Sequence, residues 1–130
     1  MRYEIEFFGH ENIRSNHKKT IEITKESHLT PRGDCIVGVN ADFNEKELMR
    51  VEGNFKMIIT VDGITEELFF EKNPDFSDKT ELVIRRGEFS SERTLGLRAD
   101  RVCSDFSDEF RQRLKIPRNK IDIEIISIKE

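Results

Sequence analysis

The middle of the chain carries the feature that most constrains its fold, a β-hairpin. Residues 55–61 form the clearest strand pattern, and residues 64–71 form a second run of the same kind. Only Asp62-Gly63 separates the two runs. An Asp-Gly pair between two such runs favours a two-residue hairpin, because both residues tolerate the left-handed backbone that the turn requires. The sequence therefore predicts an antiparallel pair of strands at this point.

Short strand patterns recur along the rest of the chain. Residues 2–8 and 20–24 alternate between apolar and polar side chains, which is typical of strands with one buried face. In the last predicted strand the inward positions change phase between Ile125 and Ile126, which indicates a bulge. The other strands are predicted at residues 35–39, 81–86, 94–98 and 121–128.

Two short helices are predicted among these strands. The first covers residues 43–52, with Asn44 as its N-cap and Gly53 as its stop. The second covers residues 105–116, where apolar residues recur at helical spacing and a proline follows the last turn. The predicted fold class is mainly β with two short helices. A two-sheet, jelly-roll-like sandwich and a compact β-barrel built from two related ββαβ halves both satisfy the pattern.

Residues 30–42 combine a turn, a strand and a polar exit in one stretch. Pro31 and Gly33 mark the turn, because proline restricts the backbone and glycine frees it. Residues 35–39 are apolar and rich in β-branched side chains, which favours a strand buried on both faces. Gly38 inside this strand predicts a bulge or a close backbone approach.

The end of that stretch recurs later in the chain. Gly38-Val39-Asn40-Ala41-Asp42 is echoed by Gly96-Leu97-Arg98-Ala99-Asp100. Each copy follows two predicted strands and precedes a helix and another strand. One interpretation is an internal duplication that relates residues 20–61 to 78–128 within a single domain of residues 1–130; the alternative is a chance match.

Size and composition favour a single domain with a charged surface. At 130 residues roughly two-thirds of the unfolded surface can be buried. No apolar run approaches the ~20 residues of a membrane span, and the N-terminus lacks a signal-peptide pattern. We therefore expect a cytoplasmic protein with no membrane partner. Cys35 and Cys103 are expected to be thiols rather than a disulfide, and their separation in space is left open.

Charge is unevenly distributed along the chain. The net charge is −4, yet residues 85–120 hold ten bases against six acids, and residues 41–80 hold ten acids against five bases. This asymmetry predicts either a positive patch or a solvated surface of mixed charge.

The candidate catalytic residues are His10, His17 and Asp34. A histidine can act as a general acid or base near neutral pH, and Asp34 or Asp42 could orient it. The histidine spacing matches no standard metal site, so no metal is expected, and the alternative role for the histidines is in surface turns. Glycine-rich phosphate loops and nucleophile elbows are absent from the sequence.

The candidate ligand-binding residues are polar side chains in loops and strand exits: Asn12, Arg32, Asn40, Asp42, Arg98 and Asp100. We expect a site where the loop of residues 9–12 meets the turn of residues 30–34, because a β body holds such loops in place. The alternative is structural: the aspartates stabilise helix N-termini or the turn.

Three classes of function remain open from the sequence. The first is a module that binds a polar or anionic ligand, such as a nucleotide, RNA or a phosphorylated metabolite; Arg14, Lys18 and Lys19 support it. The second is an enzyme that uses His10 or His17 with an aspartate. The third is a protein-interaction module. The sequence specifies neither cofactor nor oligomeric state.

Several motifs occur together in the order Gly9-His10 with Asn12, His17-Lys18 with Thr20, Thr30-Pro31-Arg32-Gly33-Asp34-Cys35-Ile36-Val37-Gly38-Val39, and Arg98-Ala99-Asp100. In this combination the chain resembles a small archaeal family of stand-alone proteins known as a domain of unknown function. Glu11 stands where that family is expected to have proline. The resemblance implies an archaeal, cytoplasmic protein with a β-rich, sandwich-like fold, and it implies no activity.

Overall fold

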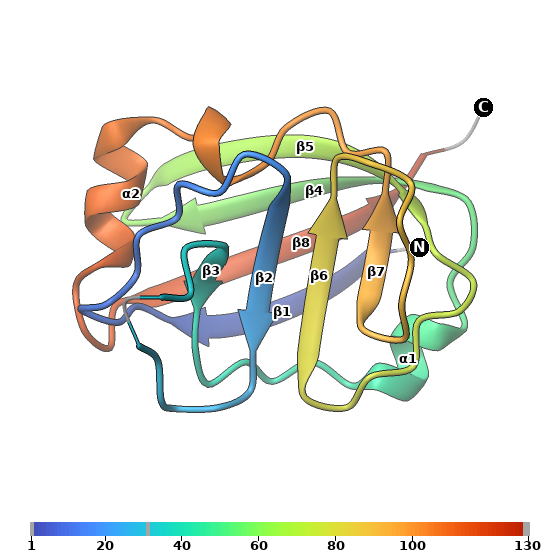
Figure 1. The fold of residues 1–130 in the computed structure, drawn as a ribbon, viewed down its shortest axis with the longest axis horizontal. Coiled ribbons are helices and arrows are strands. Elements are labelled where there is room, and N and C mark those ends of the chain that lie inside the picture. The colour runs from blue at the N-terminus through green and yellow to red at the C-terminus, as the bar shows by residue number, and fades with distance from the viewer. Residues whose placement is uncertain (1, 31, 129–130) are drawn as a thin grey trace.

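A computed structural model describes residues 2–30 and 32–128 and contains eight strands, two α-helices and one 3-10 helix (Figure 1). The expectation for Pro31 lies outside the described residues. None of the described helices is long and apolar enough to cross a membrane. The strands are β1 (Arg2–Phe8), β2 (Thr20–Thr24), β3 (Ile36–Gly38), β4 (Asn54–Val61), β5 (Ile64–Lys72), β6 (Glu81–Arg85), β7 (Thr94–Leu97) and β8 (Lys120–Ser127). The helices are α1 (Glu45–Met49), η1 (Cys103–Asp105) and α2 (Asp108–Leu114).

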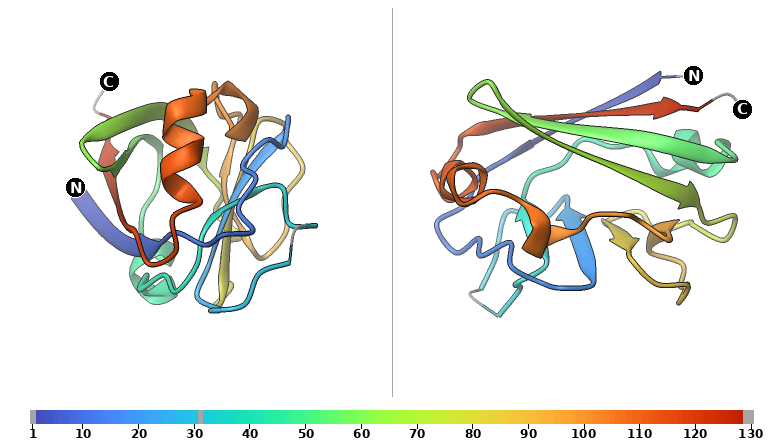
Figure 2. Two further views of the ribbon diagram at one scale, coloured as in Figure 1. Left: turned by 90° about the vertical axis from the view of Figure 1, so that its left-hand side faces the viewer. Right: turned by 90° about the horizontal axis from the view of Figure 1, so that it is seen from above.

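The strands form one mixed sheet that folds into two layers. Its order is β1-β8-β4-β5-β7-β6-β2-β3. Seen from above, β1, β8, β4 and β5 form one layer and β7, β6, β2 and β3 the other, with the two α-helices at opposite ends (Figure 2). The outermost strand β1 meets the segment just after β3 at an isolated bridge between Phe8 and Val39, and within the described residues no ladder closes the sheet into a barrel. The prediction of a β-rich, sandwich-like fold with two short helices is confirmed.

The central hairpin forms as predicted. Val61 of β4 pairs with Ile64 of β5, and the two residues between them have positive φ angles, 50° at Asp62 and 78° at Gly63. Along β4 the alternate side chains are buried, since the strand shows only one face to solvent. Inward side chains from both layers make one hydrophobic cluster between them.

The predicted bulge in the last strand is wrong. In β8 the pairing runs without a shift, because Ile125 faces Tyr3 and Ile126 faces Arg2 in β1. Ile125 is buried and Ile126 is only partly buried, so the alternation continues to the end of the strand. The helices are also shorter than predicted: α1 has 5 residues and α2 has 7. Residues 103–105 form η1, a separate 3-10 turn ahead of α2.

Two parallel strand pairs, which the sequence did not predict, contain the irregularities. The register shifts between Glu22 and Ile23 where β2 meets β3, and between Val83 and Ile84 where β6 meets β7. The prediction of a bulge or close approach at Gly38 is confirmed. The register shift between β2 and β3 is the irregularity, and the ring of Phe7 packs closely against Gly38. A Cβ atom on Gly38 would lie 1.8 Å from that ring.

Candidate functional site

The loop between β1 and β2 forms one side of an open, polar cavity of about 470 Å³. We call it the basic cavity. Its lining combines three cations, two further polar side chains and one acid: Arg14, Lys18, Lys19, Asn16, His17 and Asp34. The first five come from a single loop, and Asp34 comes from the turn before β3. Thus His17 and Asp34, both candidate catalytic residues, lie at the same cavity.

Hydrogen bonds hold the backbone of this loop in place. The carbonyl of Asp34 accepts from the N–H groups of Asn16 (3.0 Å) and His17 (3.3 Å). The carbonyl of His17 accepts from the N–H of Ser104 at 3.0 Å. His17 Nδ1 accepts from the N–H groups of Lys19 (3.0 Å) and Thr20 (3.1 Å). Because Nδ1 is an acceptor, the neutral ring carries its proton on Nε2 and can donate from there.

The cations of the basic cavity are unpaired. Arg14, Lys18 and Lys19 are exposed, and within residues 2–30 and 32–128 none of them forms an ion pair. Arg86 also fixes this loop, because its Nε donates to the Lys18 carbonyl at 3.4 Å and its guanidinium pairs with Asp105. The backbone is therefore ordered while the cationic side chains stay available.

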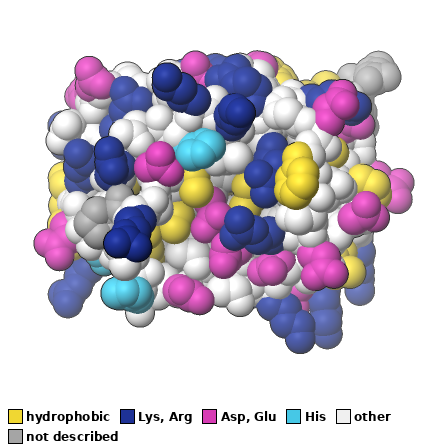
Figure 3. All heavy atoms as spheres, in the orientation of Figure 1, with side chains coloured by type: hydrophobic (Ala, Val, Ile, Leu, Met, Phe, Trp, Pro, Cys, Tyr) yellow, Lys and Arg dark blue, Asp and Glu magenta, His cyan; other side chains and the backbone are white. Residues whose placement is uncertain are grey.

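Most of the bases in residues 85–120 form ion pairs with acids of the same chain. Seven of the ten bases form ion pairs, namely Arg86, Arg93, Arg98, Arg101, Arg111, Arg113 and Lys120. Several partners lie in the acidic segment of residues 41–80, for example Glu66, which pairs with Arg101 at 2.6 Å. Basic and acidic side chains are interspersed on the face that Figure 3 shows. The two segments thus compensate one another in part, through Arg98, Arg101 and Arg113, and the other paired bases have acids outside residues 41–80 as partners.

The loop of residues 9–12 makes one contact beside the turn of residues 30–34, and the basic cavity lies instead between residues 14–19 and Asp34. Asn12 Nδ2 donates to the carbonyl of Leu29 at 2.8 Å, next to the turn of residues 30–34. His10 Nδ1 accepts from the N–H of Asn12 at 3.0 Å and so orders its own turn. Arg32 and His28 are exposed, and neither lines the basic cavity.

The two strand-exit motifs, whose polar residues were grouped among the candidate ligand-binding residues, do not lie at one site. Asn40 and Arg98 both adopt left-handed backbone conformations, with φ of 56° and 53°. The carboxylates of Asp42 and Asp100 accept backbone N–H bonds from β1 and β5, each at 2.8 Å. The two aspartates line different cavities. The structure therefore separates these pairs from each other and from the basic cavity.

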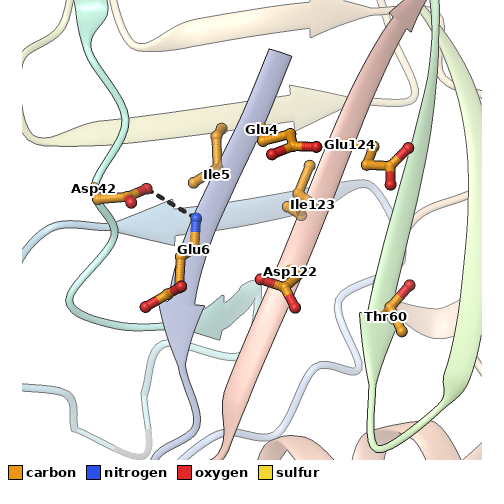
Figure 4. A pocket seen from close by; sticks show the side chains of 8 residues that line it. All are labelled: Glu4, Ile5, Glu6, Asp42, Thr60, Asp122, Ile123 and Glu124. Carbon is orange, nitrogen blue, oxygen red and sulfur yellow. Dashed lines mark hydrogen bonds between the residues drawn. The ribbon is translucent and has the colours of Figure 1, made fainter. Parts of the chain in front are cut away.

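Asp42 belongs to an acidic hollow on the outer face of β1, β8 and β4, with a volume of about 580 Å³ (Figure 4). Across the strands, Glu4 faces Glu124 and Glu6 faces Asp122. Like charges directly opposite one another repel. Two cations reduce that repulsion, because Arg2 pairs with Glu124 at 2.8 Å and Lys120 with Glu6 at 3.3 Å. The hollow was not predicted, although the alternation of acids in residues 4–6 and 122–124 is visible in the sequence.

No cluster of three or more histidine, cysteine, aspartate or glutamate side chains suited to a metal ion occurs in the part of the chain that the structure describes.

Besides the acidic hollow, the sequence did not predict a cluster of charged side chains around Glu22 in β2. Its side chain is only 10% exposed, and Arg93 lies 3.4 Å from its carboxylate. Arg93 also pairs with Glu81 at 2.5 Å. Burial raises the pKa of Glu22 to about 7, the Glu81 carboxylate adds to the rise, and Arg93 and Arg85 oppose it. No sequence pattern marked Glu22, because its burial depends on strands far away in the chain.

The two cysteines lie close together as free thiols. Cys103 Sγ donates to the carbonyl of Cys35 at 3.2 Å. Burial raises the pKa of Cys35 to about 11 and that of Cys103 to about 12, so both thiols stay protonated at neutral pH. The expectation of two thiols rather than a disulfide is confirmed.

The fold and these sites define a class of small, two-layered β proteins with polar surface cavities and free thiols. Within this class, the chain belongs to the family described as "Domain of unknown function (DUF371)", which matches residues 5–128. It is also 36% identical over 124 residues to an uncharacterised protein of Methanocaldococcus jannaschii, MJ0206, a match that covers 88% of this chain and 92% of that protein. The resemblance to a small archaeal family of unknown function is confirmed.

Proposed function

We propose that this protein is a binding module for a phosphate-bearing small molecule, such as a nucleotide or a phosphorylated metabolite, and that the ligand occupies the basic cavity. The observation that carries the proposal is the presence of Arg14, Lys18 and Lys19 around one cavity, without an ion pair to any described acid. Most arginines of the β body, in contrast, have such partners.

Ligand binding at this cavity requires little reorganisation. The loop is already fixed by the bonds to Asp34, Ser104 and Arg86, so ordering it does not reduce affinity. Lysine ammonium groups act as point charges for phosphate oxygens, and Arg14 adds a planar fork that can bind two of them. The Nε2–H of His17 supplies a further donor. Asp34 opposes an anion, and its position suits hydroxyl groups of a ligand.

A small ligand fits this cavity better than RNA does. An RNA interface needs a row of cations that follows the backbone. Most bases of residues 85–120 are paired with acids, whereas Arg14, Lys18 and Lys19 lie without an ion pair to any described acid in one short loop. We therefore expect the cavity to bind one or two phosphate groups of a small molecule. The experiment below includes RNA, so that binding of RNA instead of a small molecule would be detected.

The direct test is isothermal titration calorimetry with inorganic phosphate, ATP and a short single-stranded RNA at two salt concentrations. The double variant Lys18→Gln/Lys19→Gln should weaken ATP binding by about tenfold or more, because each lost charge–phosphate contact costs about 1 kcal/mol or more. The matched control is Lys46→Gln/Lys79→Gln, which removes two exposed lysines outside the cavity. Equal affinities of the two double variants for ATP would exclude the basic cavity as the binding site. Tight binding of RNA, without binding of phosphate or ATP, would show that the ligand is RNA and not a small molecule.

A second candidate function is an enzyme that uses His17 as general acid or base with Asp34. The specific observation in its favour is that both residues line the same cavity. Turnover of a bound phosphate compound that is lost in His17→Asn, with binding retained, would support it.

A further inference from the structure

Lys72, the last residue of β5, has an unusual environment for a lysine. Its residue exposure is only 5%, and it shares the inward face of β5 with Leu68 and Phe70. Its ammonium nitrogen is shielded from solvent and has no hydrogen-bond partner among the described residues. Lysines are rarely buried without a partner, because transfer of an ammonium group out of water is costly.

The acids near Lys72 do not compensate this burial. Glu52 lies on an exposed loop and acts on Lys72 only through its charge. Glu71, the neighbouring residue, is paired with Arg98 at 2.5 Å. Burial lowers the pKa of Lys72, and the charge of Glu52 only partly opposes this effect. Lys72 therefore loses its proton more readily than a lysine of ordinary pKa.

Lys72 lines an open cavity of about 520 Å³ between the segment that follows α1 and the end of β5. Its other lining residues are Val51, Glu52, Gly53, Asn54, Glu71 and Pro74. A hydrogen bond from the N–H of Lys72 to the carbonyl of Gly53, at 2.9 Å, joins the two sides. This cavity shares no residue with the basic cavity.

The lining also restricts the class of ligand. Two carboxylates, those of Glu52 and Glu71, repel an anion, and Arg98 neutralises only one of them. An uncharged compound with an electrophilic carbon suits the unpartnered amine of Lys72, whose shielded Nζ reaches the cavity by a rotation of the side chain. Unprotonated lysine in a desolvated site is the nucleophile that attacks carbonyl groups.

We propose that this cavity binds a small, uncharged aldehyde or ketone and that Lys72 forms an imine with it. The Nζ lone pair attacks the carbonyl carbon and forms a C–N bond. The carbonyl oxygen leaves as water with the two protons of the amine, and a C=N double bond remains. No oxidant or reductant is needed, and the step is independent of phosphate binding at the basic cavity.

The test uses propionaldehyde as probe, with sodium cyanoborohydride to reduce any imine to a stable secondary amine, at pH 7 on the full chain. Peptide mapping by mass spectrometry then compares the rate of modification of Lys72 with those of Lys46 and Lys79, which are exposed in the same molecule. Lys72 should react about tenfold faster or more. If Lys72 stays unmodified while the two exposed lysines react, its burial is purely protective and the proposal is wrong.

Glu52→Gln provides an independent variant that leaves the amine in place. Removing this carboxylate lowers the pKa of Lys72 further, so modification of Lys72 should become faster while that of Lys46 and Lys79 stays unchanged. Unchanged or slower modification of Lys72 in this variant would contradict a reactive amine. Lys72→Met should abolish the fast adduct, and a melting curve checks that this variant is folded.

Discussion

Asp42 and Asp100 make the same pair of hydrogen bonds at two distant places in the fold. The Oδ1 atom of Asp42 accepts from the N–H of Glu6 at 2.8 Å, and the N–H of Asp42 donates to the Glu6 carbonyl at 3.1 Å. Asp100 does the same with Phe69, at 2.8 and 3.2 Å. Each aspartate thus ties a strand exit to the first strand of its own half of the chain.

The surroundings of the two aspartates also match. Ala41 donates to the Thr24 carbonyl and Ala99 to the Arg85 carbonyl, both at 3.0 Å. The strand order has the same symmetry, since β4 and β8 are adjacent in one layer and β2 and β6 in the other. These correspondences support our proposal of an internal duplication, extended to include β1 and β5. Superposition of residues 20–61 on 78–128 is its test, and failure of α1 to coincide with α2 would contradict it.

Removing either carboxylate should destabilise the protein by a similar amount. Asp42→Ala and Asp100→Ala each leave one strand N–H without its acceptor, and we expect a loss of about 1 kcal/mol in the free energy of unfolding. Urea unfolding measures this change. Asp75→Ala is the control, because its exposed side chain has no such role. Two variants as stable as the control would show that these bonds do not matter for stability.

Gly38→Ala and Gly96→Ala should both be strongly destabilising. A Cβ at Gly38 would lie 1.8 Å from the Phe7 ring, and one at Gly96 would lie 2.4 Å from the Phe70 ring. Moving a packed ring costs about 1–3 kcal/mol. The control Gly87→Ala should be neutral, because nothing lies within 4 Å of its added Cβ.

If the Phe7 ring is what destabilises Gly38→Ala, a smaller side chain at position 7 should restore part of the lost stability. Phe7→Leu removes the ring that the new methyl group meets, so the double variant Gly38→Ala/Phe7→Leu should lose less stability than the sum of the two single changes. Thermal unfolding of the four proteins gives the coupling. Strict additivity would mean that Gly38 is required for another reason.

Glu22→Gln should stabilise the protein at alkaline pH and leave it unchanged at acid pH. The pKa of Glu22 in the folded protein is raised from 4.5 to about 7. The neutral side chain therefore contributes stability that is fully present below pH 4.5 and is lost as the pH rises through 7, where the buried carboxyl group ionises. At about 1.4 kcal/mol for each pKa unit, the gain at pH 8 is at most about 3 kcal/mol.

Urea unfolding of Glu22→Gln and of the unchanged protein at pH 4 and pH 8 checks this sign. The groups around Glu22 are Glu81, Arg85, Arg93 and Cys35, and all of them remain in the variant. A stability difference that is the same at both pH values would show that Glu22 does not titrate in this range.

Two substitutions of His17 should separate its backbone role from its role toward a ligand. In His17→Asn the amide oxygen can replace Nδ1 as the acceptor for Lys19 and Thr20, so stability should change little. His17→Ala leaves both N–H groups without an acceptor and should cost about 1 kcal/mol or more. Both variants lack Nε2, so both should bind ATP more weakly if that atom contacts the ligand. Unchanged affinity in His17→Asn would limit His17 to ordering the loop.

The sequence by itself determined much of the local structure of this protein. Alternation placed β1 and β2, Asp62-Gly63 determined the hairpin, and Gly38 marked a close approach, because each signal depends on neighbours in the chain. The family could also be identified from short motifs. For the site, sequence reasoning found the basic loop and named Asp34, but it also included Arg32 and the strand exits, which lie elsewhere.

Only the tertiary structure decided how these pieces meet. Alternation shows which side chains share a face, yet it does not specify the partner strand, so the parallel pairs β2–β3 and β6–β7 could not be predicted. Asp34 reaches the basic cavity through hydrogen bonds to a loop that lies many residues earlier. Glu22 and Lys72 have shifted pKa values because distant strands and loops exclude water from them, and desolvation by remote segments leaves no local pattern in a sequence.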